Sequence, residues 1–200
     1  VTLIDRSGEE RLSAGRPDQL VTEPKNAAYF HEAITLPPRG VYVSSPYVGA
    51  SLSGPEIRTV LMDLAVPVYS QGNRPQGVLL LTLDWRRLLD GLPHRLQPGK
   101  DIEILLVDAL GFSLLADTDA VEPFGVSVAE RKSSYWEAMV GRSRGVATLG
   151  KETLMFRTHD VRSQHYLSEA EQVVSDSRSQ PWRIGIAVTR PSWGQLLMEN

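Results

Sequence analysis

The chain has 200 residues, of which 42% are hydrophobic and 22% are charged, and its formal net charge is −3. This composition is typical of globular protein and provides enough residues for one large domain or two small ones. Because basic residues neither predominate nor form a run, sequence-independent binding to nucleic acid is not expected. The chain has no cysteine, which excludes disulfides, thiolate metal sites and a cysteine nucleophile.

The sequence predicts neither a transmembrane helix nor a signal peptide. Its longest wholly apolar run lies around residues 78–81, whereas a helix needs about 20 apolar residues to span a bilayer. The chain starts on Val1, without Met, inside a predicted strand. We therefore expect it to be a piece cut from a longer protein.

The first half of the chain begins with a predicted hairpin and a helix. Residues 1–4 form a predicted strand, 9–13 form a more polar return strand, and Gly8 suits the positive φ of the turn between them. Apolar residues at helical spacing then predict a helix over 26–34, for which Asn26 is a suitable N-cap.

A three-stranded antiparallel sheet is predicted next. Residues 41–45 are β-branched and aromatic, and Pro46 and Gly49 interrupt the chain before a long apolar run over 57–69. A short polar connector separates this run from 77–84, which is too uniformly apolar to have a solvent face. These strands predict a sheet core rather than an active-site loop.

The second half of the chain restarts the pattern of the first. Asp108 and Gly111 follow Asp5 and Gly8 at one and the same interval, and each pair lies at the turn after an apolar strand. A segment rich in proline and glycine separates the two halves. We therefore expect two modules and a linker, at 1–91, 102–200 and 92–101 respectively.

The later elements agree with this internal repeat. A helix is predicted over 132–140, and strands over 145–149, 153–158 and 182–188. Residues 166–178 form a polar insertion to which the sequence assigns no form.

No catalytic constellation is found. His31-Glu32 lacks the second histidine that a zinc helix needs, and there is no Gly-x-Ser-x-Gly elbow, P-loop or dinucleotide fingerprint. The sequence therefore predicts no cofactor, no metal site and no enzymatic activity in this segment.

Two aspartates stand out because a buried charge is costly unless it is paired. Asp63 lies inside the apolar run 57–69, where it faces water from an edge strand, pairs with Arg58 or contacts a ligand. Asp84 follows the next strand, where it caps a helix over 85–89 or contacts a ligand.

Tyrosines cluster in sequence near these strands. Tyr42, Ser44 and Tyr47 lie at the strand before Asp63, and Tyr29 lies on the preceding helix. Aromatic side chains with polar tips suit both the edge of a core and a small-molecule pocket.

Several stretches carry a resemblance to a known family. Residues 41–47, 64–69 and 76–84, with the Leu-Leu helix that follows, resemble the membrane-distal half of the double Cache domains. Residues 106–117, with Phe124-Gly125, are similar to the start of the membrane-proximal half. Double Cache domains are extracytoplasmic, PAS-like sensor modules of bacterial histidine kinases, diguanylate cyclases and chemoreceptors.

The resemblance implies an α+β fold of two tandem PAS-like (Cache) modules, each a roughly five-stranded antiparallel sheet flanked by helices. It implies a receptor embedded in the inner membrane on both sides of a periplasmic segment, with a kinase or diguanylate cyclase output in the cytoplasm. The fold is compatible with a homodimer. A small molecule would bind the distal module between its sheet and its helix.

The resemblance also bears on the ligand. The amino-acid-binding subgroup grips the ligand carboxylate with an arginine where this chain has Ala27, and has an aspartate where this chain has Gly49. An α-amino acid is therefore not predicted, and two aspartates in the site would favour a cationic ligand such as an amine. The alternative is a module that binds a partner protein, such as a periplasmic binding protein, with no small ligand of its own. The candidate ligand contacts are Tyr29, Tyr42, Ser44, Tyr47, Asp63 and Asp84.

Overall fold

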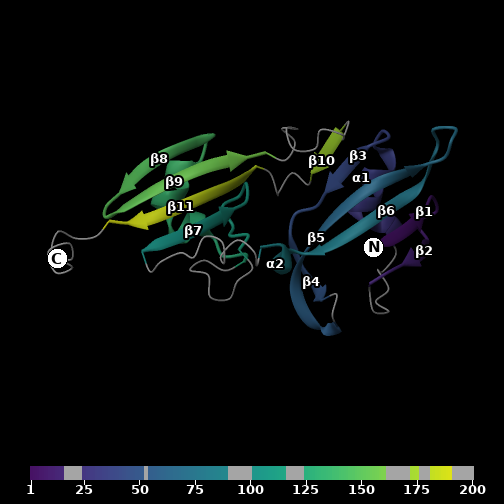
Figure 1. Ribbon diagram of the computed structural model, residues 1–200, viewed down its shortest axis with the longest axis horizontal. Helices are drawn as coiled ribbons and strands as arrows, with labels where there is room; N and C mark the ends of the chain where they lie inside the picture. Colours follow the sequence, from purple (N-terminus) through teal and green to yellow (C-terminus); the bar gives the residue numbers. More distant parts are fainter. Residues whose placement is uncertain are drawn as a thin grey trace. The chain divides into compact units, whose positions relative to one another are not determined.

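The computed structural model describes residues 1–15, 24–51, 54–89, 101–115, 124–160, 172–175 and 181–190. The chain divides into two compact units, which Figure 1 shows coloured along the sequence. Val1–Leu88 and Val161–Gln180 form the first unit, and Leu89–Asp160 and Pro181–Asn200 form the second.

The first unit is built on a sheet with the strand order β10-β3-β5-β6-β1-β2, in which β4 also pairs with β5. Seven strands of the described ranges take part in this sheet. The elements of the first unit are β1 (Thr2–Asp5), β2 (Glu10–Ser13), η1 (Pro24–Asn26), α1 (Ala28–Thr35), β3 (Gly40–Val43), β4 (Tyr47–Ser51), β5 (Gly54–Tyr69), β6 (Pro75–Asp84), α2 (Trp85–Leu89) and β10 (Gln172–Ser175).

One face of this sheet carries the core of the first unit. Side chains alternate between the two faces of a strand, so residues two apart lie on the same face. Helix α1 covers that face, as Figure 1 shows near β3 and β6. The buried residues of this core are Ile4, Phe30, Ala33, Leu36, Tyr42, Ala65, Val78 and Leu80.

The strand β10 joins the first sheet although it lies far along the sequence. Gln172 pairs with Gly40 and Ser175 with Val43, and the two strands run parallel. The other strand pairs of this sheet are antiparallel. Part of the polar insertion expected over 166–178 is therefore a strand of the first unit.

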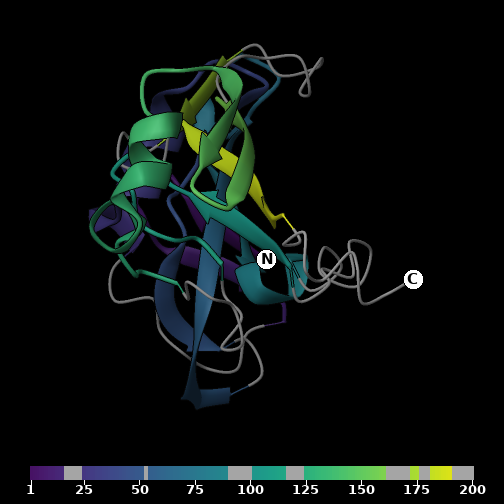
Figure 2. The same ribbon diagram turned by 90° about the vertical axis from the view of Figure 1, so that its left-hand side faces the viewer.

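The second unit is a four-stranded antiparallel sheet in the order β7-β11-β9-β8. Its helices lie against one face, where Tyr135 and Met139 pack onto Leu154 and Phe156. Figure 2 shows these helices on one side of the strands. The elements are β7 (Ile102–Val107), α4 (Val128–Arg131), α5 (Ser133–Met139), β8 (Arg144–Leu149), β9 (Glu152–His159) and β11 (Trp182–Thr189).

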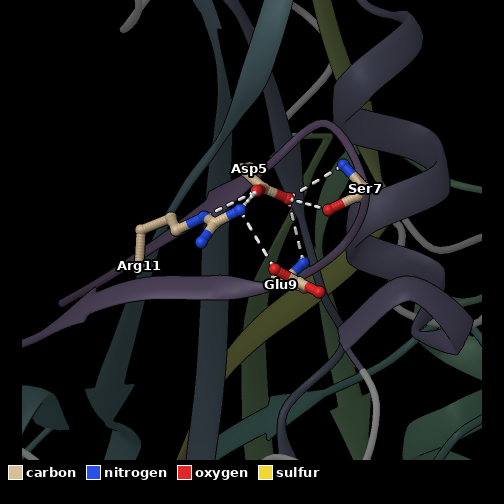
Figure 3. A network of polar contacts seen from close by, with 4 residues as sticks. All are labelled: Asp5, Ser7, Glu9 and Arg11. Carbon is tan, nitrogen blue, oxygen red and sulfur yellow. Dashed lines mark hydrogen bonds and ion pairs between the residues drawn. The ribbon is translucent and has the colours of Figure 1, made fainter.

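The turn between β1 and β2 is closed by Asp5 (Figure 3). Its Oδ1 accepts hydrogen bonds from the backbone N–H of Ser7 at 2.8 Å and of Glu9 at 3.1 Å. Its Oδ2 accepts a hydrogen bond from Arg11 Nε at 2.6 Å. Gly8 takes a φ of 83°, which glycine adopts without steric cost.

The turn after β7 repeats this geometry at Asp108. The Asp108 Oδ1 accepts hydrogen bonds from the backbone N–H of Leu110 and of Phe112, both at 2.8 Å. Gly111 takes a φ of 93°. In both turns the aspartate Oδ1 thus accepts the backbone N–H groups of the second and fourth residues after it, which is the structural counterpart of the internal sequence repeat.

The α+β fold with largely antiparallel sheets agrees with the expectation from the sequence, but the strand counts differ. Among the described residues the sheets have seven and four strands instead of about five each. Strand β4 runs through Gly49, where the sequence predicted an interruption. Most of the linker expected over 92–101 lies outside the described residues.

The first helix also begins later than predicted. Helix α1 starts at Ala28 with Ala27 as its N-cap, and no side chain caps it. Asn26, the predicted N-cap, instead ends η1. No helix within the described ranges is long and apolar enough to cross a membrane.

Candidate functional site

Asp63 is a charged residue on the helix-covered face of the first sheet. It lies on β5 opposite Thr82 of β6, and Ala65, two residues further on the same face, belongs to the core under α1. Only 5% of Asp63 is exposed. The position is therefore one where a carboxylate must be held by hydrogen bonds.

Two explanations that the sequence allowed for Asp63 are wrong. The residue does not face water from an edge strand, because β5 pairs with β6 on one side and with β3 and β4 on the other. It does not pair with Arg58 either, since Arg58 Nη2 donates to the Val48 carbonyl at 3.4 Å.

Hydroxyl groups hold the Asp63 carboxylate from two other strands. The Tyr47 hydroxyl donates to Oδ2 at 3.0 Å, and the Thr82 hydroxyl donates to Oδ1 at 2.7 Å. Ser44 fixes the backbone of the same residue, because its Oγ accepts from Asp63 N–H at 2.8 Å and its N–H donates to the Asp63 carbonyl at 2.9 Å. Residues of β4 and β6 thus hold the Asp63 carboxylate, and the residue after β3 holds its backbone.

The other two tyrosines lie beside this cluster. Tyr42 pairs with Ala65 across β3 and β5 and is buried in the core. Tyr29 of α1 is half-buried and packs against the same core. The structure therefore brings Ser44, Tyr47 and Asp63 together, whereas Tyr42 and Tyr29 belong to the core that α1 covers.

Asp84, the sixth candidate, serves the fold at the start of α2. Its Oδ1 accepts a hydrogen bond from Arg87 N–H at 3.2 Å, and its Oδ2 lies 3.8 Å from Arg87 Nε. Satisfying a free N–H in the first turn is the role of an N-cap. Of the two roles that the sequence allowed for Asp84, the structure shows the cap.

Thr82 was not among the candidates from the sequence. The signal was present, since Thr82 is the polar residue inside the apolar run 77–84. Its meaning depends on the register, which sets Thr82 opposite Asp63. We define the Asp63 cluster as Ser44, Tyr47, Asp63 and Thr82.

The Asp63 carboxylate is a hydrogen-bond acceptor, and hydroxyl groups donate to both of its oxygens. A carboxylate accepts hydrogen bonds only, and charge-assisted hydrogen bonds are about twice as strong as neutral ones. No group of three or more His, Asp or Glu residues that could hold a metal ion occurs in the part of the chain that the structure describes.

Comparison with known proteins gives structural matches only. No protein-family model matches the chain, and a search of curated proteins finds no match. The extracellular domain of vpHK1S-Z8, described as a histidine kinase, is 16% identical with a TM-score of 0.63, covering 99% of this chain and 69% of that one.

Chemoreceptor domains of two Pseudomonas species are similar as well. The ligand-binding domain of Pseudomonas fluorescens CtaA, in complex with L-serine, is 18% identical with a TM-score of 0.55, covering 94% of this chain and 71% of that one. The ligand-binding domain of Pseudomonas aeruginosa PctB, in complex with L-Arg, is 19% identical with a TM-score of 0.54. The match covers 99% of this chain and 68% of that one. The chain has the fold of receptor sensor domains. This agrees with the resemblance to Cache domains at the level of the fold.

Proposed function

We propose that this chain is the extracytoplasmic sensing segment of a bacterial transmembrane receptor. It binds a small molecule and passes its occupancy to a cytoplasmic output domain such as a histidine kinase or a diguanylate cyclase, without catalysing a reaction itself. The observation that carries this proposal is the buried carboxylate of Asp63, held by Tyr47 and Thr82 on the face of the sheet that α1 covers. The fold shared with sensor domains supports it.

The tandem arrangement is part of the proposal. The membrane-distal Cache module comprises residues 1–91 with the added strand β10, and the membrane-proximal module comprises the rest of 102–200. The matching turns at Asp5 and Asp108 support descent of both modules from one repeat. Ligand binding in the distal module would shift a pre-existing equilibrium of the receptor, with the segment on the periplasmic side of the inner membrane.

The ligand that fits the Asp63 cluster is a small cation such as an amine. The carboxylate of Asp63 would accept its N–H groups, and Tyr29, Tyr42 and Tyr47 would supply aromatic surface, which attracts cations. Asp84 would add negative charge from its position at the α2 cap. The L-serine and L-Arg complexes of the chemoreceptors show that this fold accommodates small polar ligands in those proteins.

The experiment is a thermal-shift screen against amines, amino acids, carboxylates, purines and sugars. A ligand that binds only the folded state at 100 times its Kd adds about 2.7 kcal/mol to stability. Asp63→Asn should weaken an amine at least tenfold, about 1.4 kcal/mol. The matched control is Asp101→Asn, which changes an exposed aspartate of the other unit and should leave the affinity for the amine unchanged.

The result also decides between the two functions considered from the sequence. Equal amine affinity in the Asp63→Asn variant would remove the Asp63 cluster from the site. If no compound shifts the melting temperature of the folded protein, the result favours the alternative, a module that binds a partner protein. That alternative is then tested by binding to purified periplasmic binding proteins.

A further inference from the structure

The second unit has a buried arginine where the first has a buried valine. The turns that begin with Asp5 and Asp108 fix the correspondence, because the residue before each turn pairs with Val78 in one sheet and with Arg183 in the other. Val78 is 0% exposed and Arg183 is 7% exposed. Since an apolar side chain satisfies the fold at this position, packing alone does not explain a guanidinium there.

The Arg183 guanidinium is only partly satisfied by the protein. Its Nη1 donates to the Asp108 carbonyl at 3.2 Å, and its Cζ lies 4.7 Å from the centre of the Trp136 ring. Its Nε is buried and has no hydrogen-bond acceptor. No carboxylate of the described ranges forms an ion pair with it, although arginine is almost never fully buried unless it is paired.

Asp108 influences Arg183 by its charge but forms no ion pair with it. The Asp108 carboxylate accepts the backbone N–H groups of Leu110 and Phe112 in its own turn. Burial lowers the pKa of Arg183, and the charge of Asp108 opposes this effect. A guanidinium nevertheless stays protonated in proteins, so a positive charge is buried here with no carboxylate of the described residues within ion-pair distance.

The geometry of the free donors indicates the kind of ligand. Nη1 donates to the Asp108 carbonyl, and the ring of Trp136 lies near the guanidinium. The edge formed by Nε and Nη2 is therefore the part of the guanidinium that can donate to a ligand. This edge matches two oxygens of a carboxylate or a phosphate, with two parallel hydrogen bonds.

We propose that the second unit binds a small oxyanion at the Nε edge of Arg183, beside Trp136. This site lies in the other unit from the Asp63 cluster and takes the opposite charge. The outcome of its test is therefore independent of whether the proposed amine site exists.

The test uses sodium acetate and inorganic phosphate as probes, with sodium chloride holding the ionic strength constant. Thermal unfolding and tryptophan fluorescence are both measured, because Trp136, one of the four tryptophans of the chain, lies against the guanidinium. We expect at least one probe to give a saturable rise in melting temperature and a fluorescence change with the same midpoint. The probe that responds identifies the oxyanion as a carboxylate or a phosphate.

Variants of Arg183 decide whether the response belongs to this site. Arg183→Val should abolish the response and still fold, since valine stands at the equivalent position of the first unit. Arg183→Lys keeps the charge but not the fork, and should weaken binding at least tenfold. Arg157→Val makes the same change at an exposed position of β9 and should leave the response intact. The proposal is overturned if neither probe gives a saturable response, or if Arg183→Val responds as the wild type does.

Discussion

Asp63 and Thr82 face each other across β5 and β6, and the Thr82 hydroxyl donates to Asp63 Oδ1 at 2.7 Å. Thr82→Val keeps the shape of the side chain and removes this donor to a buried carboxylate. We expect a loss of about 1.5–3 kcal/mol in the free energy of unfolding, the range for hydrogen bonds to charged groups. Urea denaturation of the variant and of wild type measures this loss.

Thr82→Ser is the matched control for that variant. It keeps the hydroxyl and loses a methyl group, so its cost should be smaller than that of Thr82→Val. Equal destabilisation by both variants would mean that packing, and not the hydrogen bond, is what Thr82 contributes.

The Asp5 turn should lose stability in acid. The hydrogen bonds from Ser7 and Glu9, together with Arg11, hold the pKa of Asp5 below its usual value of about 4. A lowered native pKa means that the stabilisation is present above about pH 4 and is lost as the pH falls towards the native value. Asp5→Asn should therefore be less stable than wild type at neutral pH, and the difference should shrink in acid.

The Asp108 turn should show the opposite dependence on pH. Burial raises the pKa of Asp108, although backbone N–H groups such as that of Phe112 lower it. A raised native pKa means that the stabilising contribution is largest below about pH 4 and is lost as the pH rises through the native value. Asp108→Asn keeps a hydrogen-bond acceptor without an ionising group. Its free energy of unfolding should therefore increase relative to that of wild type as the pH rises.

Unfolding of both variants in urea between about pH 3 and pH 7 checks the pair of predictions. The two stability differences should change with pH in opposite directions. Parallel curves would contradict the assignment of opposite environments to the two turns.

Gly77 of β6 pairs with Asp5 of β1 and leaves no room for a side chain. A Cβ at this position would lie 2.1 Å from the Ile4 carbonyl oxygen, which is backbone and cannot move aside. We expect Gly77→Ala to cost at least about 3 kcal/mol, at the upper end for overpacking. Gly72→Ala, where the nearest atom would be Ser70 Oγ at 3.9 Å, is the control and should stay close to wild type in thermal melts.

Lys132 and Glu103 form a partly buried ion pair in the second unit. Their side chains are 22% and 14% exposed, and the Lys132 Nζ also lies 5.0 Å from the centre of the Tyr135 ring. Lys132→Met keeps the apolar stem and leaves the Glu103 carboxylate without its cation, so we expect a loss of roughly 1–3 kcal/mol. Lys151→Met removes an exposed lysine and should change unfolding by urea little. Similar values for the two variants would contradict a stabilising pair.

The sequence predicted most strands because their signals are local. The runs around 57–69 and 77–84 are apolar over the whole length of a strand, and β5 and β6 are found there. The turns at Asp5 and Asp108 were also predictable, because an aspartate followed by a glycine three residues later specifies its own hydrogen bonds. Strand β4 was missed because its pairing with β5 outweighs the weak strand propensity of Gly49.

What the sequence by itself determined is therefore most of the strands, the repeat, and the two aspartates, Asp63 and Asp84, that had to find partners. Only the tertiary structure decided which partners they found. Thr82 meets Asp63 through the register of two strands, β10 joins β3 from the other half of the chain, and Arg183 takes the place of Val78 in the second repeat. A pairing such as that of β10 with β3 joins residues far apart in the chain, and both pairing and register are fixed by packing of the whole sheet and not by local propensity.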